Sequence, residues 1–133
     1  MVRTVVAVVA GLIVWFVIAT LVNLLFRALW PGYAEVEIGM NFTRAMLLGR
    51  LLLGALSSLC AGLTLAWIAK RNGRTVEVLG ILLTLVFIPV HYHVWDKFPL
   101  AYHLIFLASL LPVTVLGARL FRPGSVDRQG ATT

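Results

Sequence analysis

The sequence predicts an all-α integral membrane protein: a four-helix transmembrane bundle with short loops and both termini in the cytoplasm. Three observations support this prediction. Hydrophobic residues make up 61% of the 133 residues and charged residues only 12%, whereas soluble domains average about 45–50% and about 25%. The chain has four long stretches without Asp, Glu, Lys or Arg, and the cations lie beside these stretches. The composition excludes a soluble enzyme, a disordered chain, a collagen and a disulfide scaffold.

The four apolar stretches cover residues 4–26, 51–69, 78–95 and 98–118. Each comes close to the roughly 20 apolar residues that a helix needs to cross a bilayer. They lack the alternation of apolar and polar residues that a membrane β-barrel requires. With their polar ends included, we expect helices over residues 4–30, 44–69, 76–95 and 99–121. These form one transmembrane domain, residues 1–122, followed by a polar, flexible cytoplasmic tail over residues 123–133.

The cations predict the orientation of the bundle. Seven cations belong to the side with both termini and the second loop: Arg3, Lys70, Arg71, Arg74, Arg119, Arg122 and Arg128. The opposite side has three cations, Arg27, Arg44 and Lys97, and the acidic residues Glu35, Glu37 and Asp96. Since cytoplasmic loops carry an excess of Lys and Arg, the termini are expected inside. The same pattern argues against nucleic acid as a partner, despite a net charge of +6.

The first loop and the second helix have distinct compositions. Trp30, Pro31 and Gly32 end the first predicted helix, and we expect a mildly acidic loop from there to about residue 43. The second helix has small residues at every fourth position: Gly54, Ser58, Gly62 and Ala66. Small residues at this spacing allow two helix backbones to approach closely in a membrane. This stripe predicts packing within the chain, with dimerisation as the alternative.

A polar layer is predicted in the outer half of the bundle, from Asn23, Arg50, His91 and His103. Ionisable groups within a membrane are costly and face protein or water. His91 and His103 belong to antiparallel helices joined by a tight turn, so both lie about 6 Å below the outer interface and are able to face each other. Asp96 lies in that turn and is available to neutralise a cation. His93 joins the layer only if Pro89 breaks the helix.

The polar layer has several interpretations. His91 and His103 are a candidate pair of metal or haem ligands. Zinc sites usually have three or four ligands, and the third here would have to be His93, Asp96 or Glu37. The simpler interpretation is a hydrogen bond between the two histidines. Transport is a further alternative, but the layer has no ionisable continuation toward the cytoplasm. Catalysis has little support, because no nucleophile with a neighbouring base is evident.

The favoured function from the sequence is a non-catalytic accessory or interaction subunit of a membrane complex. The alternative is binding or transport of a small ligand, metal or haem at the layer around Arg50, His91 and His103. No cofactor is predicted. The expected partners are the lipid bilayer and a larger membrane complex or a second copy of the chain. The expected location is a bacterial inner membrane, as a multi-pass protein.

Overall fold

A computed structural model describes residues 2–70 and 74–121 and contains five helices within them. These are α1 (Val2–Leu29), α2 (Tyr33–Gly39), α3 (Arg44–Ala69), α4 (Arg74–His93) and α5 (Leu100–Leu120). All except α2 are long and apolar enough to cross a membrane. The predicted all-α four-helix bundle is therefore confirmed, and the chain is a multi-pass membrane protein. The predicted flexible tail and three of the counted cations, Arg71, Arg122 and Arg128, lie outside the described residues.

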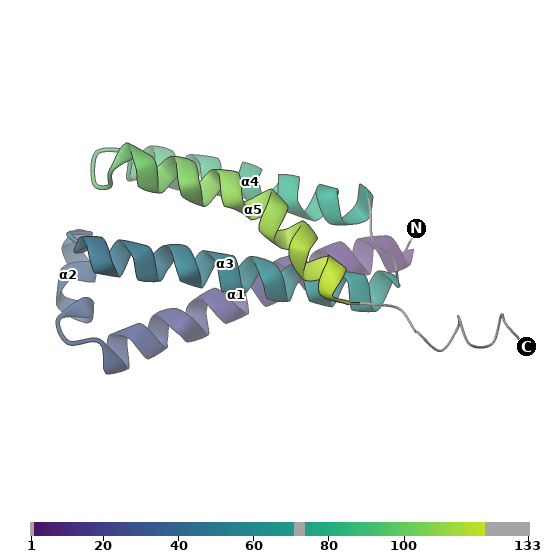
Figure 1. The fold of residues 1–133 in the computed structure, drawn as a ribbon, viewed down its shortest axis with the longest axis horizontal. Coiled ribbons are helices and arrows are strands. Elements are labelled where there is room, and N and C mark those ends of the chain that lie inside the picture. Colours follow the sequence, from purple (N-terminus) through teal and green to yellow (C-terminus); the bar gives the residue numbers. More distant parts are fainter. Residues whose placement is uncertain (1, 71–73, 122–133) are drawn as a thin grey trace, which may run out of the picture.

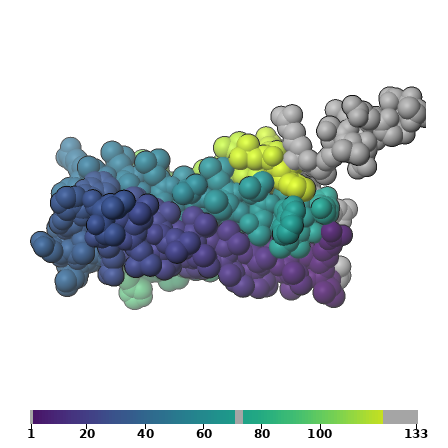
Figure 2. All heavy atoms as spheres, turned by 90° about the horizontal axis from the view of Figure 1, so that it is seen from below, coloured from purple at the N-terminus to yellow at the C-terminus, as the bar shows by residue number. Residues whose placement is uncertain are grey.

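The four long helices form a bundle in which α3 packs against both α1 and α5, while α4 packs mainly against α5. The start of α1 and the end of α5 lie at one end of this bundle, and α2 lies at the other (Figure 1). Toward the α2 end, α1 diverges from α4 and α5 (Figure 1). The view from below, turned by 90°, shows α1 running along the molecule beside α3 (Figure 2). The divergence separates α1 from α4 in one half of the bundle.

The sequence predicted a loop where the structure has the short helix α2. Gly32 adopts a left-handed conformation with φ of 80°, which turns the chain back after α1, and glycine adopts this conformation without steric cost. Tyr33 then inserts fully buried between Phe26 and Phe42, with ring centroids 5.5 and 5.3 Å away. Burial of this aromatic ring holds α2 across the end of the bundle. Tertiary packing, rather than helix propensity, therefore explains why a seven-residue segment is helical.

The small residues of α3 lie inside the chain. Gly54, Ser58, Gly62 and Ala66 are all buried. A Cβ atom at Gly62 would collide with the backbone carbonyl of Thr114 on α5, and a Cβ atom at Gly117 of α5 would collide with the backbone of Leu59. The two backbones thus meet at reciprocal glycines, as expected for packing between membrane helices.

The half of the bundle near the termini is tightly closed. A Cβ atom at Gly11 of α1 would meet the Leu79 side chain of α4 at 2.6 Å, and one at Gly80 of α4 would collide with Leu111 of α5. At this end the Arg3 Nε donates a hydrogen bond to the carbonyl oxygen of Ile68 near the end of α3, at 2.7 Å. A cation at a helix C-terminus also interacts favourably with the helix dipole. The bundle is therefore closed near the termini and more open near α2.

Candidate functional site

A cavity of about 460 Å³ lies between α1 and α4 in the half of the bundle near α2. Residues from all five helices line it, and the α1 and α4 residues Phe16, Leu24 and Val90 are about half exposed at its edge. Because these exposed residues belong to membrane-spanning helices, the cavity opens sideways toward the bilayer. Its volume lies within the range of about 300–1,000 Å³ that is typical of ligand sites.

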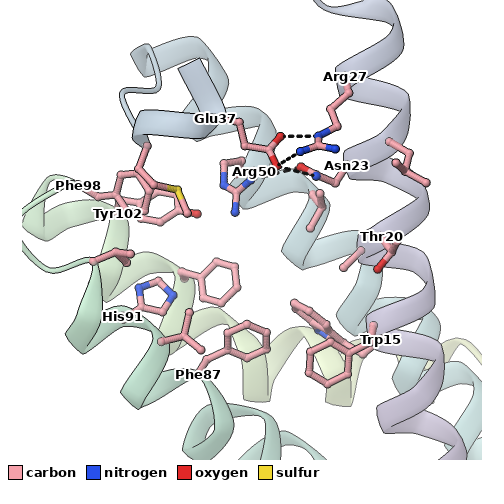
Figure 3. Close-up of a pocket in the computed structure, with 18 residues that line it drawn as sticks. Trp15, Thr20, Asn23, Arg27, Glu37, Arg50, Phe87, His91, Phe98 and Tyr102 are labelled. Carbon is pink, nitrogen blue, oxygen red and sulfur yellow. Dashed lines mark hydrogen bonds and ion pairs between the residues drawn. The ribbon is translucent and has the colours of Figure 1, made fainter. Parts of the chain in front are cut away.

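An aromatic cluster forms the floor of the cavity, on the side toward the termini. The ring centroids of Trp15 and Phe87 are 4.6 Å apart, and those of Phe87 and Phe106 are 5.3 Å apart. The Trp15 indole Nε1 donates a hydrogen bond to Ser58 Oγ at 3.0 Å, which fixes the ring between α1 and α3. The base of the cavity is therefore apolar and aromatic (Figure 3).

Polar side chains gather at the opposite end of the cavity, beneath α2 (Figure 3). Asn23 of α1 is the central acceptor: its Oδ1 receives hydrogen bonds from Tyr33 Oη at 2.7 Å and from Arg50 Nη1 at 3.3 Å. Arg50 Nη1 also donates to Tyr33 Oη at 2.8 Å. Three helices therefore contribute to one hydrogen-bonded group. Tyr33 could not be assigned to it from the sequence, because its position depends on the unpredicted helix α2.

Glu37 of α2 closes this network on the solvent side. Its two carboxylate oxygens accept hydrogen bonds from Arg27 Nε and Nη2, both at 2.9 Å, and Oε1 accepts a longer bond of 3.5 Å from Asn23 Nδ2. The hydrogen bonds from Arg27 lower the pKa of Glu37 below its ordinary value of 4.5, and partial burial opposes this shift. A bidentate Arg–carboxylate pair is directional, so Glu37 is oriented toward Arg27.

Arg50 has a different environment from Arg27. Within the described parts of the chain, no carboxylate lies within ion-pair distance of Arg50, and the single ion pair is Arg27–Glu37. The Nε of Arg50 is buried without a hydrogen-bond partner. Its guanidinium carbon lies 4.8 Å from the centroid of the Phe42 ring, a favourable position for a cation. Arg50 is therefore a half-buried positive charge at the cavity wall whose direct partners are neutral.

His91 and His103 face each other across α4 and α5, with their Nδ1 atoms 2.7 Å apart. The His103 Nε2 lies 3.3 Å from the carbonyl oxygen of Trp95. A carbonyl oxygen only accepts, so His103 Nε2 holds a proton, and in the neutral pair His91 Nδ1 donates to His103 Nδ1. This arrangement leaves His91 Nε2 as an acceptor. His91 lines the cavity, whereas His103 lies behind it and is fully buried.

The remaining predicted site residues lie elsewhere. Helix α4 continues through Pro89 without a break to His93, which is exposed. Asp96 is exposed in the following turn. Neither residue lines the cavity, and no three His, Cys, Asp or Glu side chains cluster as metal ligands within residues 2–70 and 74–121. The structure thus brings Asn23, Arg50 and His91 to one cavity and leaves His93 and Asp96 outside it.

The serine and threonine hydroxyl groups below the cavity are bonded to their own helices. Ser57, Ser58 and Thr114 donate to the carbonyl oxygens of Leu53, Gly54 and Leu110, four residues earlier. Thr84 does the same within α4. Their protons are therefore used within the helices below the cavity, and the cavity ends on the aromatic floor. The cavity therefore has a closed floor and an opening on its side.

The sequence alone did not identify the aromatic lining of the site. Phe87, Phe98, Tyr102 and Phe106 line the cavity, yet aromatic residues in an apolar helix are ordinary packing residues. The available signal was their spacing: Tyr102 and Phe106 are four positions apart on one face of α5, and Phe98 lies four positions earlier, just before this helix begins. Comparison with protein-family models, with curated proteins and with solved structures found no match.

Proposed function

We propose that this protein binds a chain-bearing amphiphile from the bilayer in the cavity between α1 and α4. The observation that supports this most strongly is the polarity of the cavity along its length. Its base is the aromatic cluster of Trp15, Phe87 and Phe106, and its upper end holds Asn23 and Arg50. An amphiphile has the same division between an apolar chain and a polar head. The sideways opening admits such a molecule from the lipid.

The proposal develops the binding alternative predicted from the sequence. That alternative required Arg50, His91 and His103 to converge on a common cavity. Arg50 and His91 line the cavity, whereas His103 lies behind it and is bonded to His91. The direct bond between His91 and His103 favours hydrogen bonding over metal ligation for this pair. The accessory role in a larger complex or a homo-oligomer stays a prediction, compatible with a protein that binds lipid.

The proposed orientation determines which leaflet supplies the ligand. Positive residues toward the termini predict a cytoplasmic position for that end, so the cavity faces the outer leaflet. We retain the bacterial inner membrane as the proposed location. A ligand in this cavity would enter from the outer half of that membrane.

Fluorescence quenching of Trp15 tests the proposal. The chain has four tryptophans, and replacing Trp30, Trp67 and Trp95 by Phe leaves Trp15 as the single reporter at the cavity floor. An uncharged amphiphile with a brominated chain, added to the protein in phosphatidylcholine vesicles, is expected to quench this fluorescence saturably. The matched control carries the tryptophan at the lipid-facing position Ile13, as Ile13→Trp with Trp15→Phe, and is expected to show only linear quenching.

A second pair of variants tests whether the cavity itself is the site. Ala19 lines the cavity, and Ala19→Phe is expected to fill it and abolish saturable quenching. Ala28 is exposed on the same helix and lies outside the cavity, so Ala28→Phe should leave the quenching unchanged. Linear quenching of Trp15 in the parent protein, or saturable quenching that survives Ala19→Phe, would overturn the proposed function.

A further inference from the structure

We infer that the ligand head is an oxyanion, a carboxylate or a phosphate, and that Arg50 is the residue that binds it. This inference rests on the proposed function and specifies the class of ligand. It begins from the charges at the upper end of the cavity. Arg27 and Glu37 neutralise each other through two hydrogen bonds of 2.9 Å. Among the described residues, Arg50 donates to the neutral groups of Asn23 and Tyr33 and has no carboxylate partner. The described lining therefore holds one cation in excess.

A positive charge in this position is costly unless an anion joins it. A half-buried guanidinium beside aromatic rings loses much of its hydration. Its Nε is buried without a hydrogen-bond partner, so the donor set of the side chain is incomplete. A planar guanidinium has five N–H donors and binds carboxylates and phosphates through pairs of them. An oxyanion at Arg50 supplies the missing charge and further acceptors for the guanidinium group at the cavity wall.

Glu37 is unable to take this role in the observed arrangement. Both of its oxygens are bonded to Arg27, and Oε1 is also 3.5 Å from Asn23 Nδ2. Glu37 instead lines the cavity next to the head-group position. A carboxylate that is already paired with a cation repels a second anion less than a free carboxylate does. The pairing with Arg27 thus makes the Arg50 end compatible with an anionic head.

The rest of the upper wall suits the same head group. Arg50 and Tyr102 lie at the same end of the cavity, above the level of His91 (Figure 3). Tyr102 has a hydroxyl donor, and hydroxyl groups bind carboxylate and phosphate oxygens. The apolar floor lies on the other side of His91 (Figure 3). A single chain extending from Arg50 toward Trp15 therefore passes from polar to apolar surroundings without crossing the bundle.

The test compares brominated amphiphiles that share one chain and differ in the head. The four heads are a carboxylate, a phosphate monoester, an alcohol and an amine, each added to the single-Trp15 protein in phosphatidylcholine vesicles above the pKa of the acid. We expect half-maximal quenching at about tenfold lower membrane concentrations for the carboxylate and the phosphate than for the alcohol, because a charge-assisted hydrogen bond contributes this much. The amine should bind most weakly.

Two variants assign the preference to Arg50. Arg50→Gln should remove the tenfold preference while saturable quenching by the alcohol persists, which also shows that the variant is folded. Arg44→Gln changes an exposed arginine outside the cavity and should retain the preference. Equal binding of acid and alcohol by the parent protein would overturn this inference and leave the proposed function intact. A preference that survives Arg50→Gln would also overturn it, and absence of saturable quenching with every head would overturn both.

Discussion

At the scale of single residues, the most informative contrast is between two arginines on the same side of the bundle. Arg27 has a bidentate carboxylate partner, and Arg50 has neutral partners and a buried Nε without an acceptor. The sequence predicted that Arg50 belongs to a polar layer of the bundle, because an ionisable group within a membrane faces protein or water. It did not predict which carboxylate pairs with which arginine, since that depends on how α2 folds over the end of the bundle.

The Glu37–Arg27 pair predicts a pH dependence of stability. The pKa of Glu37 is lowered from 4.5 by the hydrogen bonds from Arg27, so the carboxylate stabilises the folded state above pH 4.5. This contribution decreases as the pH falls below 4.5 and is lost below the folded-state pKa. We expect the thermal midpoint in detergent to fall with pH less steeply in Glu37→Gln than in the parent protein. Glu35→Gln changes an exposed neighbour and serves as the control. Identical slopes in parent and Glu37→Gln would contradict the assigned pair.

The His91–His103 bond predicts energetic coupling between two residues. Each single substitution, His91→Leu or His103→Leu, leaves one buried ring nitrogen without its partner and should destabilise the protein by about 1–3 kcal/mol. The double variant removes both polar groups, so its loss of unfolding free energy should be smaller than the sum of the two single losses. Unfolding in mixed detergent micelles measures all four proteins of the cycle. Strict additivity would show that the bond between the rings contributes nothing to stability.

At the scale of elements, the long helices were predictable and the short one was not. The stretches without charges located α1, α3, α4 and α5, because composition alone determines whether a segment suits the bilayer core. Helix α2 is only seven residues long and is held by the burial of Tyr33. A contact between residues that are far apart in the chain is difficult to recognise from the local sequence. The polar end of the cavity depends on that contact and was therefore only partly predictable.

The contact between α3 and α5 predicts that alanine destabilises the protein more at Gly62 than at Gly54 of the same stripe. Gly62→Ala places a methyl group against the fixed backbone of Thr114 and should destabilise the protein by about 1–3 kcal/mol. Gly54→Ala meets only the Phe106 ring, at 2.8 Å, and that ring is able to shift toward the cavity. Alanine also has a higher helix propensity than glycine, which offsets part of the cost of this contact. We therefore expect Gly54→Ala to lower the free energy of unfolding by less than about 1 kcal/mol. Unfolding in mixed detergent micelles measures the stability of both variants. A larger loss of stability for Gly54→Ala than for Gly62→Ala would contradict this packing.

At the scale of the whole molecule, the asymmetry of the bundle underlies the proposed function. The end near the termini is closed by side chains that pack against glycines of the neighbouring helices, and the α2 end is open between α1 and α4. The predicted orientation places the open end outside.

Single cysteines test this orientation. Glu35 and Glu77 are exposed near opposite ends of the bundle. Glu35→Cys and Glu77→Cys, each in a Cys60→Ser background, therefore report on which side of the membrane each end lies.

An impermeant thiol reagent should label Glu35→Cys in intact cells and Glu77→Cys only after the membrane is permeabilised. The reverse pattern would place the cavity in the cytoplasmic leaflet and invert the proposed source of the ligand. The cation bias predicts the first pattern. This topology is a property of the whole chain, because the charges of every loop contribute to it.

The most direct test of the central claim is photolabelling of the protein in phosphatidylcholine vesicles with a fatty acid that carries a diazirine in its chain. We expect the label to concentrate on the cavity-lining residues of α1 and α4, within residues 15–24 and 87–91. Ala19→Phe should remove this label, whereas Ala28→Phe should not. Label spread evenly over lipid-facing positions such as Ile13 and Leu104 would overturn the proposed site, because it would show that the acid contacts the bundle only as bulk lipid.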